Sequence, residues 1–157
     1  MPIKVGKKGK VNKAVSIVWM MDEESFESFV EEFNTQYDTY MDNARKIIES
    51  KTPDRELRSL RDAVHNIASS CSFLNIENLR EFFTALETVI SNTNKRQAGK
   101  RRISPLLDKA LGIGFFKFQS VAKILDKGFP EAVEDLLKIE IIVDVENLYS
   151  IAGSQDL

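Results

Sequence analysis

The chain has 157 residues, of which 43% are hydrophobic and 29% are charged, as is typical of one globular domain with a sizeable core. A formal net charge of −2 gives no overall reason to expect a nucleic-acid partner. A single cysteine excludes an internal disulfide, so we expect a reducing, cytoplasmic location.

The first 21 residues read as a basic tail and a short lead-in segment. Five lysines fall within residues 1–13, and the apolar run AVSIVWMM follows them. This run is too short to cross a membrane and leads into Asp22, Glu23 and Glu24 without a small-residue cleavage site. We therefore expect neither a secretory signal nor a membrane anchor. The spacing leaves open whether residues 14–21 form a strand or a helical turn.

The first long helix is predicted from about Glu23 to Glu49. Its buried face carries aromatic and aliphatic side chains spaced three and four residues apart, which is the period of an amphipathic helix. These positions are Phe26, Phe29, Phe33, Tyr37, Tyr40, Ala44 and Ile47. Acidic residues at its start suit the positive end of the helix dipole.

Two further amphipathic helices are predicted next. Thr52 and Pro53 supply an N-cap and a proline at the first helical position of the second helix. Its apolar stripe is Leu57, Leu60, Val64, Ile67, Cys71 and Leu74. A cysteine on such a stripe is more often a small buried hydrophobe than a reactive thiol. Asn75 is expected to cap the third helix, whose apolar positions run from Ile76 to Ile90.

A loop is predicted from Thr93 to Arg102. Its residues 95–102 carry five positive charges in eight positions. A solvated loop is the simplest interpretation, and the alternative is an electrostatic docking element for an acidic partner.

The fourth helical region opens at Ser104 and Pro105 in the same way as the second helix. Gly112 and Gly114 interrupt it, which predicts a kink or a break into two helices. Gly128 marks its end.

Beyond this point the pattern is weaker. Glu131 to Lys138 looks helical, whereas residues 139–145 alternate as a strand would. Four helices with short links favour an all-α, antiparallel up-down four-helix bundle over residues 22–128. Residues 1–21 and 129–157 then form short N- and C-terminal extensions, the second of uncertain structure.

The only histidine, His65, lies beside the apolar stripe of the second helix and not on it. At 100° per residue its ring points roughly 130° away from the middle of that stripe, which predicts an exposed imidazole. The small residues ASSCS that follow leave room for a partner beside the ring. Four polar side chains share the helix face of His65, namely Arg58, Arg61, Ser69 and Ser72. A neutral imidazole is nucleophilic and can hold a phosphoryl group as a labile intermediate.

The sequence has few of the residues and motifs that other kinds of catalytic site require. A Ser-His-Asp arrangement needs an activated serine, and the sequence shows neither a strained nucleophile elbow nor an oxyanion loop. Zinc-ligand spacing, a P-loop and a Rossmann glycine pattern are also missing. A lone helical histidine without such context is more often structural than functional.

The run HNIASSCSFLN, which begins at His65, resembles the phosphoacceptor segment of histidine-containing phosphotransfer (HPt) domains. The usual pattern of that family is close to H-x-L-K-G-S-S-x-x-L-G. Three positions match in place: Ile67, Ser70 and Leu74. The following helix, ending in ALE, is also similar, and the resemblance spans about residues 23–127 through helix order and length.

This resemblance implies a phosphocarrier in which His65 accepts the phosphoryl group. Such a protein relays phosphate between receiver-domain aspartates, or from a sensor histidine kinase to a receiver, in a two-component phosphorelay. It needs no cofactor of its own, because Mg²⁺ sits in the partner receiver. It is a transfer intermediate rather than an enzyme in the strict sense.

Two positions depart from the family pattern. The lysine three residues after the histidine is Ala68 here, and the next glycine is Ser69. We hypothesise that Arg61, one turn upstream, replaces the lysine, with Arg58 in reserve. Ser69 and, less directly, Ser72 would contact the phosphoryl oxygens. The alternative function is a degenerate bundle that binds a receiver or kinase without accepting phosphate.

Overall fold

A computed structural model describes residues 21–97 and 103–157, with the side chains of 94–97 left aside. Over these residues the chain forms six helices and no strand. They are α3 (Glu23–Ile47), α4 (Pro53–Phe73), α5 (Glu77–Gln97), α6 (Pro105–Leu125), α7 (Glu131–Leu137) and α8 (Ile142–Ala152). The prediction of an all-α fold is therefore confirmed here, whereas the predicted four-helix bundle is not, because the described residues form six helices.

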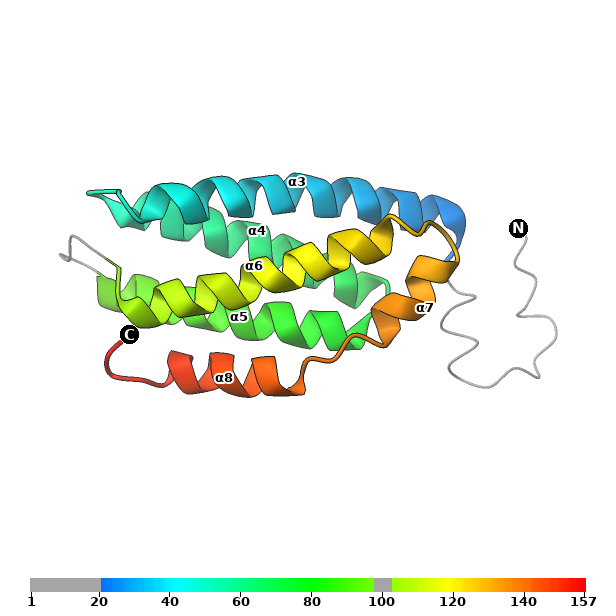
Figure 1. Cartoon of the computed structure of the whole chain (residues 1–157). Helices are drawn as coiled ribbons and strands as arrows, with labels where there is room; N and C mark the ends of the chain where they lie inside the picture. The colour runs from blue at the N-terminus through cyan, green and yellow to red at the C-terminus, as the bar shows by residue number, and fades with distance from the viewer. Residues whose placement is uncertain (1–20, 98–102) are drawn as a thin grey trace.

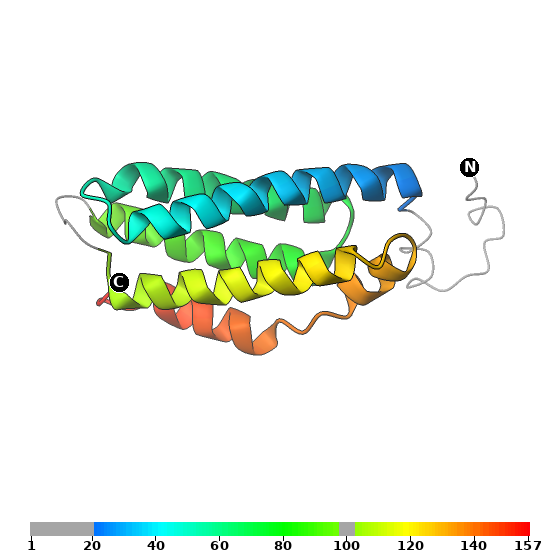
Figure 2. The same ribbon diagram turned by 45° about the horizontal axis from the view of Figure 1, so that its top comes forward.

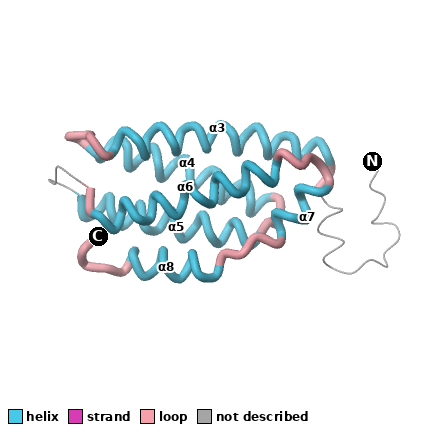
Figure 3. Tube along the Cα trace, in the orientation of Figure 1, coloured by secondary structure: helices cyan, strands magenta, loops and turns pink. Residues whose placement is uncertain are grey.

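The four long helices lie side by side, and the chain reverses direction at each link between them (Figures 1 and 2). Helix α3 packs on α4, α4 on α5, α5 on α6, and α6 returns to α3. Helix α8 runs along α5 and also contacts α6, while the short α7 joins α6 to α8 (Figures 1 and 3). Residues 139–157 therefore pack on the long helices.

The helix starts follow the sequence signals only in part. Ser104 caps α6, because its hydroxyl accepts a hydrogen bond from the Leu107 N–H at 3.1 Å. Asp22 caps α3 by accepting from the Ser25 N–H at 2.7 Å, and this bond lowers the pKa of the Asp22 carboxyl. Thr52 occupies the predicted N-cap position of α4 and Pro53 the first helical turn, but the Thr52 side chain makes no cap hydrogen bond.

Asn75 ends α4 instead of capping α5, contrary to prediction. Its φ of 62° is left-handed, a conformation that asparagine adopts more readily than most residues. The Asn75 N–H donates to the Ser72 carbonyl at 3.1 Å, and the Ile76 N–H donates to the Cys71 carbonyl at 2.8 Å. These two bonds form a Schellman C-cap, which turns the chain sharply into α5.

Two other local predictions are wrong. Helix α5 continues past Thr93 to Gln97, so the loop starts later than expected. Residues 142–145 are helical and not part of a strand, because buried side chains recur at Val145, Leu148 and Ile151, at the spacing of a helix. The predicted basic loop 95–102 and the tail 1–20 lie outside the side chains that the structure describes.

The predicted break of α6 into two helices at its glycines is also wrong, since α6 is one continuous helix. Gly114 instead allows α6 to approach α3 closely. A Cβ at this position would overlap the Tyr40 hydroxyl and lie 2.6 Å from Leu86 Cδ2. The Tyr40 hydroxyl donates to the Leu111 carbonyl at 2.7 Å, so the glycine makes room for a buried bond between the two helices. Burial raises the pKa of Tyr40, which keeps this donor protonated.

Aromatic rings from three helices meet at Phe118 of α6. The centroid of its ring lies 4.7 Å from that of Tyr40, 5.1 Å from Phe83 and 5.4 Å from Phe33. Tyr37 stacks on the same ring at 5.2 Å with an interplanar angle of 8°. Each such pair adds roughly 0.5–1.5 kcal/mol beyond the burial of its area. This cluster joins α3, α5 and α6 into one core.

Helix α8 is held at its start by a buried cation. The Lys117 ammonium of α6 donates to the Glu140 carbonyl at 2.9 Å and lies 2.9 Å from Asp144 Oδ2. It also sits 5.1 Å from the centroid of the Phe82 ring. None of the described helices combines the length and apolar character that a membrane crossing requires.

We predict that Gly114→Ala destabilises the protein by about 1–3 kcal/mol, because the new methyl group must displace a fully buried, hydrogen-bonded tyrosine. Gly112→Ala is the matched control: no atom lies within 4 Å of the added Cβ. It should be neutral or stabilise the helix by up to about 1 kcal/mol. Urea unfolding of both variants measures the difference, and equal effects would contradict the close approach of α6 to α3.

Candidate functional site

His65 lies near the middle of α4, and its side chain is 60% exposed. Its neighbours on the apolar stripe, Val64, Ile67 and Cys71, are fully buried. The prediction of an imidazole at the edge of the stripe and open to solvent is therefore confirmed. No described part of the chain covers the ring.

A glutamate of the neighbouring helix contacts the imidazole. The Nδ1 atom of His65 lies 3.1 Å from Oε2 and 3.3 Å from Oε1 of Glu87 on α5. An ionised carboxylate only accepts hydrogen bonds, so Nδ1 must carry a proton and donate it. In the neutral ring this leaves the lone pair on Nε2. The pair therefore selects the tautomer whose nucleophilic nitrogen is Nε2.

Sequence reasoning did not identify Glu87 as a site residue. Two signals in the sequence point to it once the turn at Asn75 is known. His65 lies ten residues before that turn and Glu87 lies twelve after it (75 − 65 and 87 − 75), so antiparallel helices bring them level. Glu87 also follows a buried residue, Leu86, just as His65 follows Val64, which places both at the edges of adjoining stripes.

The other predicted site residues share the helix face of His65. At 100° per residue, Arg58, Arg61, Ser69 and Ser72 all lie within about 40° of His65 around the α4 axis. All are at least partly exposed. Arg61 forms an ion pair with Asp62, at 3.5 Å between Nη2 and Oδ1. Among the described interactions, no hydrogen bond or ion pair joins any of the four to the imidazole.

Ala68 belongs to the core and not to the exposed face. Only 6% of its surface is accessible, and it packs within the main hydrophobic cluster. Its position around the α4 axis lies between Val64 and His65. A positive charge near the imidazole must therefore come from another position, and Arg61 and Arg58 are the cations on the same face.

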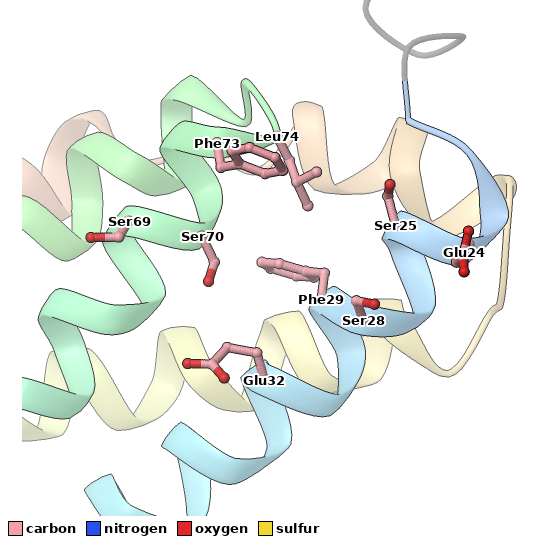
Figure 4. A pocket seen from close by; sticks show the side chains of 9 residues that line it. All are labelled: Glu24, Ser25, Ser28, Phe29, Glu32, Ser69, Ser70, Phe73 and Leu74. Atoms are coloured by element: carbon pink, nitrogen blue, oxygen red, sulfur yellow. The ribbon is translucent and has the colours of Figure 1, made fainter.

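An open groove of about 610 Å³ lies between α3 and α4, and we call it the α3–α4 groove. Figure 4 shows Phe29 and Glu32 of α3 on one side, and Ser70 and Phe73 of α4 with the adjoining Leu74 on the other. Ser69 also borders it, one helical turn beyond His65. The groove therefore adjoins the histidine face on the side away from Glu87.

Cys71 takes no part in this surface. It is fully buried, and burial raises the pKa of its thiol to about 12, which keeps it protonated at neutral pH. The prediction of a small buried hydrophobe is confirmed. Among the described residues, no three histidine, cysteine or carboxylate side chains converge as metal ligands would.

Comparison with models of protein families, with curated proteins and with solved structures finds no match for this chain. The functional interpretation therefore depends on the arrangement of the side chains around His65. The decisive features are one exposed imidazole, a carboxylate on its Nδ1 atom, and a face with two arginines and two serines.

We predict that Glu87→Ala lowers the population of the Nδ1–H tautomer of His65. A hydrogen bond to a carboxylate at a half-exposed site is worth about 1 kcal/mol, so its loss should change the tautomer ratio roughly fivefold. Since the chain has one histidine, the two ring ¹⁵N resonances report this directly at a pH where the ring is neutral. Glu81→Ala, an exposed acidic residue on another face of α5, is the control. Identical ring shifts in both variants would contradict the tautomer assignment.

Proposed function

We propose that this protein is an HPt-like phosphocarrier and that Nε2 of His65 accepts the phosphoryl group. The observation that carries the proposal is the pairing of Glu87 with Nδ1 of an imidazole that remains exposed. The four long helices would then correspond to the four-helix bundle of that family, with α7 and α8 as additions. The run HNIASSCSFLN at the histidine supports the same assignment.

The chemistry requires one bond to form and one to break. The Nε2 lone pair attacks phosphorus of a receiver aspartyl phosphate, the N–P bond forms, and the P–O bond to the aspartate breaks. The aspartate leaves as a carboxylate, and the ring keeps its Nδ1 proton and gains positive charge. Glu87 stabilises that charge because its carboxylate already accepts the Nδ1 hydrogen bond. No proton has to leave the site.

The phosphoryl oxygens need neutralising charge in the transition state. Mg²⁺ bound by the receiver supplies part of it. On this chain Arg61 is best placed for the rest, one turn from His65 on the same face, and its exposed pairing with Asp62 is weak enough to exchange. Ser69 lies one turn from His65 in the other direction, and Arg58 and Ser72 lie two turns away on the same face. The two serines can donate hydrogen bonds.

The proposal implies a receiver domain or a sensor histidine kinase as the partner, in the cytoplasm. One observation favours the alternative of a bundle that binds such a partner without accepting phosphate. Position 68 holds a buried alanine where the family pattern has a lysine, so a cation close to the histidine is missing at that position. A direct labelling experiment separates the two functions.

We predict that a phosphorylated receiver domain transfers label to this protein, and that the label is stable in alkali and labile in acid, as expected for phosphohistidine. His65→Gln should abolish it, because the amide has no nucleophilic nitrogen. Glu87→Ala should retain a slower transfer. If receivers that bind the protein leave no label, and phosphoramidate as a direct donor leaves none either, the binding-only function is correct.

We predict that Arg61→Ala slows phosphoryl transfer about tenfold, since a charged hydrogen bond to the transferring group is worth roughly 1.5 kcal/mol or more. Arg55→Ala is the matched control, an exposed arginine at the start of α4 that lies 80° from His65 around the helix axis. Single-turnover rates from a phosphorylated receiver measure both. An unchanged rate in Arg61→Ala would show that another group neutralises the phosphoryl oxygens.

A further inference from the structure

The α3–α4 groove combines an exposed aromatic side chain with acidic walls. Phe73, at the end of α4, is 84% exposed at its rim, and the buried ring of Phe29 also lines it (Figure 4). Glu24 and Glu32 line it from α3, and neither forms an ion pair with a described residue. An occupant that fits this groove therefore offers an apolar side chain with positive charge on both sides of it.

The acidity of the groove extends along α3. From Met21 to Met41 the chain has seven acidic residues and no lysine or arginine. The first cations of α3 are Arg45 and Lys46, and both pair with Asp42 at the far end of the helix. The negative charge around the groove is therefore not balanced within α3, and it attracts a cationic surface.

Helix α6 exposes a stripe of the opposite charge. Phe116 is 65% exposed, and Lys109 and Lys123 lie seven residues before and after it. At 100° per residue, both lysines lie within about 20° of Phe116 around the α6 axis, whereas Asp108 and Asp126 lie about 80° to one side. Both lysines are exposed, and neither pairs with an acidic group among the described residues. We call Lys109, Phe116 and Lys123 the α6 stripe.

The α6 stripe matches the groove in length. Each of its lysines lies about 10 Å from Phe116 along the α6 axis, and Glu24 and Glu32 are about 12 Å apart along α3. If Phe116 of a second copy lies midway between the two glutamates, each lysine is about 4–5 Å farther from the centre than the glutamate that it meets. The flexible four-carbon stem of a lysine side chain can span that difference.

We propose that a second copy of this chain docks its α6 stripe in the α3–α4 groove. Phe116 packs against Phe73, and the two lysines pair with Glu24 and Glu32. The groove and the stripe are different surfaces of one molecule, so the contact is heterologous and further copies can add to it. Because the ion pairs lie at an exposed rim, we expect reversible association that weakens when salt is added. This association goes beyond the proposed function and does not depend on the chemistry of His65.

Another exposed apolar side chain close to positive charge fits the groove less well. Ile48 is 58% exposed in the turn between α3 and α4, with Lys46 and Lys51 close to it in sequence. Lys46 already pairs with Asp42, and the acidic Glu49 directly follows Ile48. This turn therefore lacks the two unpaired cations on one helical ridge that α6 offers.

Charge reversal tests the contact. In sedimentation velocity at low ionic strength, the sedimentation coefficient of the unmodified protein should rise with concentration. Glu24→Lys/Glu32→Lys and Lys109→Glu/Lys123→Glu should each remove this rise, because like charges then face each other. An equimolar mixture of the two variants should restore it, since each surface then meets its complement in the other variant.

The apolar contact and the position of the charges have their own variants. Phe73→Ala and Phe116→Ala should each weaken association about tenfold. Glu27→Lys/Glu31→Lys is the matched control, because it changes the net charge by the same amount on the other side of α3. It should leave most of the association intact. All these side chains are exposed or half-buried, and circular dichroism verifies that the variants fold.

A spin label locates the contact. Ser120 is exposed on α6, about 40° from Phe116 around the helix axis, and Cys71 is fully buried, so a nitroxide reacts at the substituted site of Ser120→Cys alone. When the spin-labelled protein is mixed with ¹⁵N-labelled protein that carries no nitroxide, the amide resonance of Ser28 in the groove should broaden. That of Ser150 on α8 should not.

Four results would overturn the proposal. They are a sedimentation coefficient that stays constant up to about millimolar concentration, association that survives both charge reversals, association that the Glu27 and Glu31 control removes as completely as the groove variant does, and broadening confined to residues outside the groove. A monomeric protein whose groove binds a synthetic peptide with two lysines around a phenylalanine would indicate a different protein as the occupant. None of these measurements requires phosphoryl transfer, so their failure leaves the proposed function untouched.

Discussion

The site depends on the close antiparallel packing of α4 against α5. The left-handed Asn75 and its two C-cap hydrogen bonds turn the chain within a few residues, and the buried stripes on both helices set their register. With this register Glu87 comes level with His65 and reaches its Nδ1 atom. A turn longer by one residue would rotate or shift α5 and separate the two side chains.

The other helices are joined by contacts that do not involve the histidine face. Gly114 allows Tyr40 to bond the backbone of α6, and the rings around Phe118 connect three helices. Lys117 then anchors the start of α8. The histidine face itself contributes little to the core, so it can expose polar groups at small cost in stability. A carrier that must present one residue to partners benefits from such a division between a packed side and an open side.

Local patterns in the sequence were sufficient to predict the all-helical class, the stripe of α4 and the exposure of His65, because these depend on spacing along one helix. These patterns failed where contacts between helices determine the local structure. Gly114 suggests a kink until the Tyr40 hydroxyl is known to fill the space beside it. Alternation around Val145 suggests a strand until α5 and α6 supply a surface for one helical face. Glu87 could not be paired with His65 without the register of two helices.

Ala68 illustrates how the same packing constrains the chemistry. It lies between the stripe and His65 around the α4 axis and is buried in the core, so its small side chain is consistent with close helix packing there. A lysine at this position would have to extend its chain past the imidazole to reach solvent. In the proposed phosphocarrier, Glu87 would stabilise the positive charge of the phosphorylated ring from the Nδ1 side, and Arg61 would neutralise the phosphoryl oxygens. The effect of Arg61→Ala should therefore fall on transfer and leave the tautomer of His65 unchanged, whereas Glu87→Ala should affect both.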